Sequence, residues 1–87
     1  MEERGNSLQA LLDFLTALER AKIFFRLERG REETILVRVD VPGERWEVEF
    51  FASGEVEVER FGSSGQGSVG GQEAQRLLAE LFEKHRD

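Results

Sequence analysis

The residues best suited to chemistry in this 87-residue chain are the glycines of the run Gly65-Gln66-Gly67-Ser68-Val69-Gly70. The run matches G-x-G-x-x-G, in which glycines let the backbone approach a pyrophosphate, and it lies between a predicted strand and a predicted helix. No second parallel strand is predicted after that helix, and no Lys-Ser/Thr pair follows the glycines. Residues 62–71 are also half glycine, which is typical of a flexible linker. We therefore expect an internal Gly/Ser-rich loop, with nucleotide or phosphate binding through it as the alternative.

Other catalytic or metal-binding patterns are weak. The single histidine, His85, could form a hydrolytic pair with a serine of this loop, but no spacing supports such a pair. A histidine in the last turn of a helix is better explained by the helix dipole. The chain has no cysteine, and its acids lack the spacing of a calcium loop. We therefore expect a protein that is not an enzyme and has no catalytic residue, metal or cofactor.

The charge balance narrows the range of partners. Eighteen acidic residues against twelve basic ones give a net charge of −6, which argues against binding to nucleic acid. The longest apolar runs have three residues, such as Ile35-Leu36-Val37, so no membrane span or signal-peptide core is expected and the chain is predicted to be cytoplasmic. Arginines greatly outnumber lysines, which suggests a GC-rich and thermophilic source.

The elements that position these residues follow from hydrophobic periodicity. Leucines with helical spacing predict a helix from residue 6 or 7 to about 21, and a second apolar stripe predicts another from about 72 to 86. Between them, alternation with period two predicts four strands near 23–28, 34–41, 45–51 and 55–59. Short turns, among them Pro42-Gly43, make these strands an antiparallel meander. We predict one α+β domain over 1–87, a two-layer α-β-β-β-β-α sandwich with both helices on one face of the sheet and the other face open.

The open face of this predicted sheet has an unusual composition. A three-residue loop over 52–54 pairs Glu49 with Glu57 and Glu47 with Glu59, and like charges in such positions repel. Arg38 lies opposite Glu47 or Glu49, depending on the register at the Pro42-Gly43 turn. Trp46 falls on the inward face and is expected to anchor the core, with its indole N–H reaching a turn or the rim.

The stretch VPGERWEVEFFASGEVEVERF, residues 41–61, resembles a segment of a family of small uncharacterised bacterial proteins that share a VPGxRWEVEF strand pair. The opening residues 8–15 are also similar, whereas the Gly/Ser run departs from the family pattern. The resemblance implies a bacterial origin and one intact domain. It implies no activity.

We therefore expect a small acidic protein-interaction domain that uses the open sheet face. Its partner would be a protein with a basic patch, or a second copy in a homodimer. The alternative for this face is a plain solvated surface with tolerated apolar residues. The residues predicted to form the interaction face are Phe24, Leu36, Arg38, Glu47, Glu49, Phe51, Glu57, Glu59 and Phe61.

Overall fold

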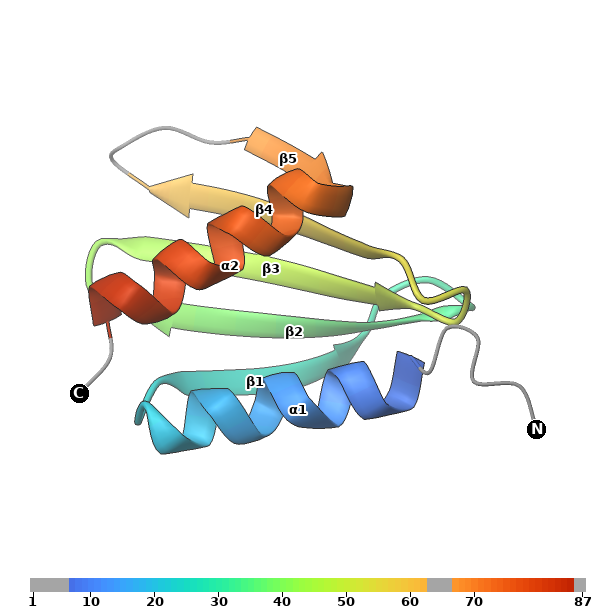
Figure 1. The fold of residues 1–87 in the computed structure, drawn as a ribbon, viewed down its shortest axis with the longest axis horizontal. Helices are drawn as coiled ribbons and strands as arrows, with labels where there is room; N and C mark the ends of the chain where they lie inside the picture. The colour runs from blue at the N-terminus through green and yellow to red at the C-terminus, as the bar shows by residue number, and fades with distance from the viewer. Residues whose placement is uncertain (1–6, 63–66, 86–87) are drawn as a thin grey trace.

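The computed structural model describes residues 7–62 and 67–85, and for residues 67–69 the backbone alone. Two helices and five strands follow one another along the chain (Figure 1). They are α1 (Ser7–Arg20), β1 (Phe24–Arg29), β2 (Thr34–Val41), β3 (Glu44–Phe51), β4 (Val56–Gly62), β5 (Gly67–Gly70) and α2 (Gly71–His85). The predicted α+β architecture, with an antiparallel β1–β4 meander between two helices, is confirmed.

The sheet has one strand more than the alternation predicted. β5 pairs antiparallel with β4, so the strand order is β1-β2-β3-β4-β5. The linker prediction for 62–71 is therefore wrong for Gly67–Gly70, because pairing with β4 makes a strand there that composition does not indicate. Residues 63–66 of that run, including the first two residues of the G-x-G-x-x-G motif, lie outside the described residues.

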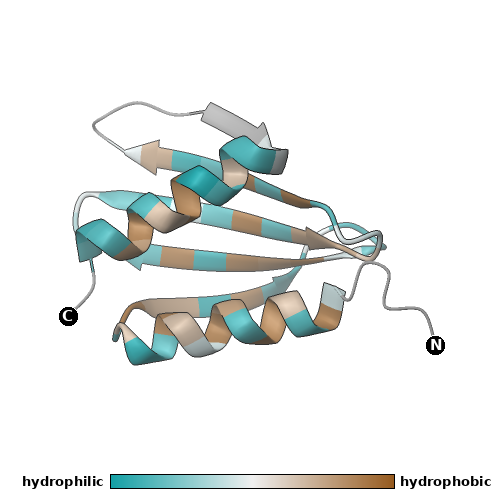
Figure 2. Ribbon diagram, in the orientation of Figure 1, coloured by the Kyte–Doolittle hydropathy of each residue, from teal (hydrophilic) through white to brown (hydrophobic). Residues whose placement is uncertain are grey.

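The core lies between one face of the sheet and both helices. Hydrophobic and polar residues alternate along β2 and β3, as the bands of Figure 2 show, and the inward set includes the fully buried Val37, Trp46 and Val48. Phe14 and Leu18 of α1 and Ala74, Leu78 and Leu81 of α2 join the same buried cluster. Both helices therefore cover one face, and the other face is open.

The connection from α1 to β1 is tight and needs an unusual backbone conformation. Lys22 has a φ of 61°, and the backbone N–H groups of Lys22 and Ile23 donate to the carbonyl oxygens of Glu19 and Leu18 at 3.1 and 2.9 Å. These two bonds form a Schellman motif, which caps the free carbonyls at the end of the helix. The helix thus ends sharply although no glycine marks the boundary.

The Pro42-Gly43 turn determines the register of β2 and β3. Gly43 has a φ of 81°, which suits the third position of a type II turn after proline. Val41 then lies opposite Glu44, and Arg38 opposite Glu47.

No helix in the described part of the chain is long and apolar enough to cross a membrane.

Candidate functional site: the open face of the sheet

The open face is made of the side chains that point away from both helices. The register places the predicted glutamate pairs opposite one another: Glu47 lies opposite Glu59, and Glu49 opposite Glu57. The residues of the open face are Phe24, Arg26 and Glu28 of β1; Thr34, Leu36, Arg38 and Asp40 of β2; Arg45, Glu47, Glu49 and Phe51 of β3; and Glu57, Glu59 and Phe61 of β4. All nine predicted interaction residues therefore belong to the same face.

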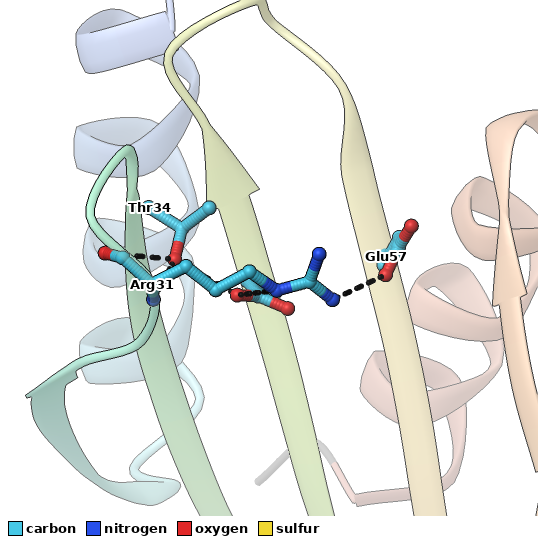
Figure 3. Close-up of polar contacts among 4 residues, drawn as sticks. Arg31, Thr34 and Glu57 are labelled. Atoms are coloured by element: carbon cyan, nitrogen blue, oxygen red, sulfur yellow. Dashed lines mark hydrogen bonds and ion pairs between the residues drawn. The ribbon is translucent and has the colours of Figure 1, made fainter.

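Arg31, in the loop between β1 and β2, extends over this face (Figure 3). Its Nε lies 3.2 Å from Glu49 Oε2, and its Nη2 lies 3.7 Å from Glu57 Oε1. One guanidinium thus bridges two opposed carboxylates, which reduces the repulsion that the sequence predicted between them.

Thr34 holds that loop in position. Its buried hydroxyl accepts the backbone N–H of Arg31 at 2.6 Å and donates to Glu49 Oε2 at 2.8 Å. Gly30 is needed beside it, since a Cβ at that position would lie 2.5 Å from Thr34 Oγ1 and 2.9 Å from Glu49 Oε2. The position of Arg31 over the sheet therefore depends on this local packing.

A second group of ion pairs surrounds Glu47. Its Oε2 lies 3.3 Å from Arg38 Nη2 and 3.7 Å from Arg45 Nε, and Arg38 Nη2 also lies 3.4 Å from Glu28 Oε1. Glu47 thus has two cationic neighbours. Glu59, directly opposite it, has no ion pair within the part of the chain that the structure describes.

The aromatic residues of the face are not equally available to a partner. Arginines cover two of them: Arg31 lies over the ring of Phe51 at 5.3 Å, and Arg45 over the ring of Phe61 at 4.4 Å. Phe51 and Phe61 are half-buried, whereas Phe24 on the edge strand is 63% exposed. Of the three, only Phe24 presents most of its ring to solvent.

Leu36 is half-buried in the middle of the face and borders a shallow hollow of about 100 Å³. Acids dominate the rim of this hollow, which is formed by Arg31, Glu47, Glu49, Glu57 and Glu59. Its size suits the end of one side chain, and its charge suits a cation.

A second charged cluster, which was not predicted from the sequence, lies at the rim of the core on the helix side. The Glu44 side chain is only 6% exposed and lies 3.3 Å from Arg60 Nη2 and 3.9 Å from Lys84 Nζ. It also accepts the indole N–H of Trp46 at 3.0 Å, so the expectation that this N–H reaches a turn or the rim is confirmed. Alternation could have revealed the cluster, because Glu44 and Arg60 have the same parity as the core residues of their strands.

The surface at the start of α2 does not favour the phosphate hypothesis. The hollow beside Gly70 and Gly71 is lined by Glu55 and Glu57, and no Lys or Arg lines it among the described residues. Two carboxylates repel an anion, so the helix N-terminus there lacks the cationic support that a phosphate site needs.

Within residues 7–62 and 67–85, no group of three or more His, Cys, Asp and Glu side chains is arranged to hold a metal ion. His85 is half-buried in the last turn of α2, and its buried Nε2 has no hydrogen-bond partner among the described residues.

Comparisons of this chain with protein-family models, with curated proteins and with solved structures find no match. The resemblance to small bacterial proteins through the VPGxRWEVEF segment therefore stays a prediction.

Proposed function

We propose that this chain is a small, non-enzymatic protein-interaction domain that binds the basic patch of a partner protein through the β4 side of its open face. The observation that carries the proposal is the uneven charge pairing on that face. Glu47 and Glu49 are each held by arginine, whereas Glu59 has no ion pair in the described part of the chain and Glu57 shares Arg31 with Glu49. Acidic charge is therefore in excess along β4.

This arrangement costs the isolated domain stability. Like charges directly opposite one another are unfavourable by a few tenths of a kcal/mol, and an arginine at position 59 would face Glu47 with the opposite sign. A lysine or arginine of a partner would supply that missing charge, with the hollow beside Leu36 as its place on the surface. Residues that reduce stability without another structural role are typical of binding surfaces.

An external basic partner fits this site better than a second copy bound face to face. A face-to-face dimer would have to take its positive charges from the arginines of the same face. Arg38 and Arg45 already neutralise Glu47 of their own chain, so using them for a partner would expose that acid again. Arg26 has no ion pair within the described residues, but it is a single charge and cannot balance both Glu57 and Glu59.

The proposal is tested with Glu57→Lys combined with Glu59→Lys. Affinity capture from the source cells at low salt identifies the bound protein, and surface plasmon resonance then gives its association and dissociation rates. We expect the association rate for the double variant to fall about tenfold or more, since complementary charge mainly accelerates encounter. For the wild type, raising the salt concentration should lower the same rate, because exposed charges are screened over about 8–10 Å at physiological ionic strength.

The matched control is Glu19→Lys combined with Glu32→Lys, which changes the net charge equally but lies outside the open face. Amide chemical shifts of labelled wild-type protein, recorded with the captured partner, should move on β3 and β4. If the control weakens association as much as the β4 variant does, or if the shifts fall on the helices, the assignment of this face is wrong.

A stability measurement separates binding from folding. Glu59→Arg should raise the free energy of unfolding by a few tenths of a kcal/mol while it weakens partner binding. A variant that is both more stable and still fully competent in binding would contradict the proposal.

A further inference from the structure

The exposed apolar surface of this molecule lies in one region, away from the β4 acids. In the described part of the chain, the exposed large hydrophobic side chains are Leu8 and Leu12 of α1 and Phe24 and Leu27 of β1, at 65%, 46%, 63% and 52%. The sequence pattern placed Leu27 on the inward face, but α1 leaves about half of it uncovered. All four residues belong to the first helix and the first strand of the chain.

The two leucines of α1 point away from α2. The groove between the helices is lined on the α1 side by Ala10, Asp13, Phe14 and Ala17. Leu8 and Leu12, one turn apart on the helix, lie on neither that side nor the buried stripe of Phe14 and Leu18. Figure 1 shows α1 beside β1, the edge strand of the sheet. The side of α1 that faces away from α2, where the two leucines lie, is therefore the side of this edge.

Leu27 lies level with this pair of leucines. Ile23 is hydrogen-bonded to Leu18 at the end of the helix. From Ile23 to Leu27 the strand covers about 13 Å, which is the length of about nine helical residues. Counting back from Leu18 along α1 reaches the segment between Leu8 and Leu12. The three leucines thus form one apolar strip beside the edge strand.

β1 has a free edge and a favourable charge for self-association. It is a terminal strand of the sheet that the described residues form, so one row of its backbone N–H and C=O groups has no strand partner among them. It contains Arg26, Glu28 and Arg29, and is the one described helix or strand with a net positive charge in a chain of net charge −6. Because β1 carries charges of both signs, a second copy of the same strand can place a charge of one sign opposite a charge of the other.

We propose that β1 pairs antiparallel with β1 of a second copy, with Leu27 on the two-fold axis, and joins the two sheets into one. In this register Leu27 faces Leu27, and Arg26 of each copy faces Glu28 of the other, which gives two complementary charge pairs. The two-fold axis is perpendicular to the sheet, so both α1 helices lie on one face. Leu8 of one copy then packs against Leu12 of the other, and the interface is isologous. This proposal does not depend on the function proposed for the β4 side.

The charge pattern selects this register over its neighbour. A pairing centred on Arg26 would place Arg26 against Arg26 and Phe24 against Glu28. Arg26 has no ion pair within the described residues, so its own chain would not relieve that repulsion. The pairing centred on Leu27 instead places Arg26 opposite Glu28 in both copies.

The experiment is sedimentation equilibrium on the full chain from about 10 µM to about 1 mM, a range that detects dissociation constants up to the millimolar level. We expect a mass twice the 10.0 kDa monomer at the upper end. Arg26→Glu and Glu28→Arg should each weaken the dimer about tenfold or more, because each places like charges opposite one another. An equimolar mixture of the two single variants should recover the dimer, since every facing pair is then complementary.

Net charge alone cannot produce this pattern. Arg26→Glu changes the charge from −6 to −8 and Glu28→Arg from −6 to −4, yet both should weaken the dimer. The matched controls are Arg76→Glu on α2 and Glu59→Arg on β4, which should leave the mass unchanged. A monomer throughout the concentration range, no recovery on mixing, or equal loss in the controls would each overturn the proposal. Stronger association of Arg26→Glu would also overturn it, because the register centred on Leu27 places two carboxylates opposite one another at each charge pair of this variant.

Discussion

At the scale of single residues, burial and charge conflict most strongly at Glu44. Its carboxylate is almost fully removed from solvent and depends on Arg60, Lys84 and the indole of Trp46 for compensation. Because these groups come from β3, β4 and α2, the cluster joins both layers of the fold at one end of the core.

Replacing Glu44 by Gln should therefore lower the free energy of unfolding by about 1–3 kcal/mol, since Arg60 loses its closest counterion in a partly buried site. Urea denaturation followed by the fluorescence of Trp46 measures the change. Glu80 is the control, because it pairs with the same arginine at 3.6 Å but is 62% exposed, and Glu80→Gln should cost less than about 0.5 kcal/mol. Equal losses in the two variants would show that burial of Glu44 is not the cause.

Gly30 is a second position at which a single added atom, a Cβ, would change the structure of the loop between β1 and β2. A Cβ there would collide with Thr34 Oγ1 and Glu49 Oε2, so Gly30→Ala should displace the loop that carries Arg31 and cost about 1–2 kcal/mol. Gly70→Ala is the matched control, because its Cβ would have no neighbour closer than 3.6 Å. Urea denaturation of both variants compares the free energies of unfolding, and an unchanged value for Gly30→Ala would contradict the steric argument.

At the scale of elements, the turn between α1 and β1 contains strain that can be removed. Lys22 occupies the left-handed region, where a side chain costs about 1 kcal/mol and glycine costs little. Lys22→Gly should therefore raise the free energy of unfolding by about 0.5–1 kcal/mol, and Lys22→Val should lower it. Thermal denaturation ranks the three proteins, and a Val variant as stable as the Gly variant would refute this account.

The same scale shows how much of the fold can be predicted from sequence. Along β2 and β3 the inward positions are apolar almost without interruption, so the faces and the Glu49–Glu57 and Glu47–Glu59 pairs follow from parity and loop length alone. The glutamate opposite Arg38 cannot be predicted in this way. Moving the turn between β2 and β3 by one residue would shift their register by two residues, and every side chain would stay on the same face. The observed φ of Gly43 centres the turn on Pro42-Gly43.

Two features are not encoded in local pattern. β5 has almost no side-chain alternation, and its strand conformation arises from pairing with β4. In the sequence, Arg31 is one residue of a polar loop. Its ion pairs with Glu49 and Glu57 depend on the hydrogen bonds by which Thr34 holds that loop. Both features depend on contacts between segments that come together only in the folded chain, and residue spacing does not predict such contacts.

At the scale of the whole molecule, arginines connect neighbouring elements through bridged pairs of acids. Arg38 joins Glu28 to Glu47, Arg31 joins Glu49 to Glu57, and Arg60 joins Glu44 to Glu80. Networks of this kind gain importance on heating, because the desolvation penalty of charged groups falls as temperature rises.

We therefore predict a thermal midpoint above about 60 °C, near the upper end of the range of about 45–65 °C that is typical of mesophilic domains. Circular dichroism at low and high salt measures it, and salt should lower the midpoint by screening the exposed pairs. A midpoint below about 60 °C would contradict the hypothesis of a thermophilic source.

The strand order also has a consequence for how the chain folds. Every strand pairs with the one before it, so each step of sheet growth closes only a short loop and its entropy cost is small. The two helices, in contrast, come before the first strand and after the last strand along the chain, and they pack into one shared core. On a ribosome the successive hairpins can thus form as they emerge, while Trp46 and Val58 stay accessible until α2 has been synthesised. Docking of Leu78 and Leu81 then becomes the step that completes the native state.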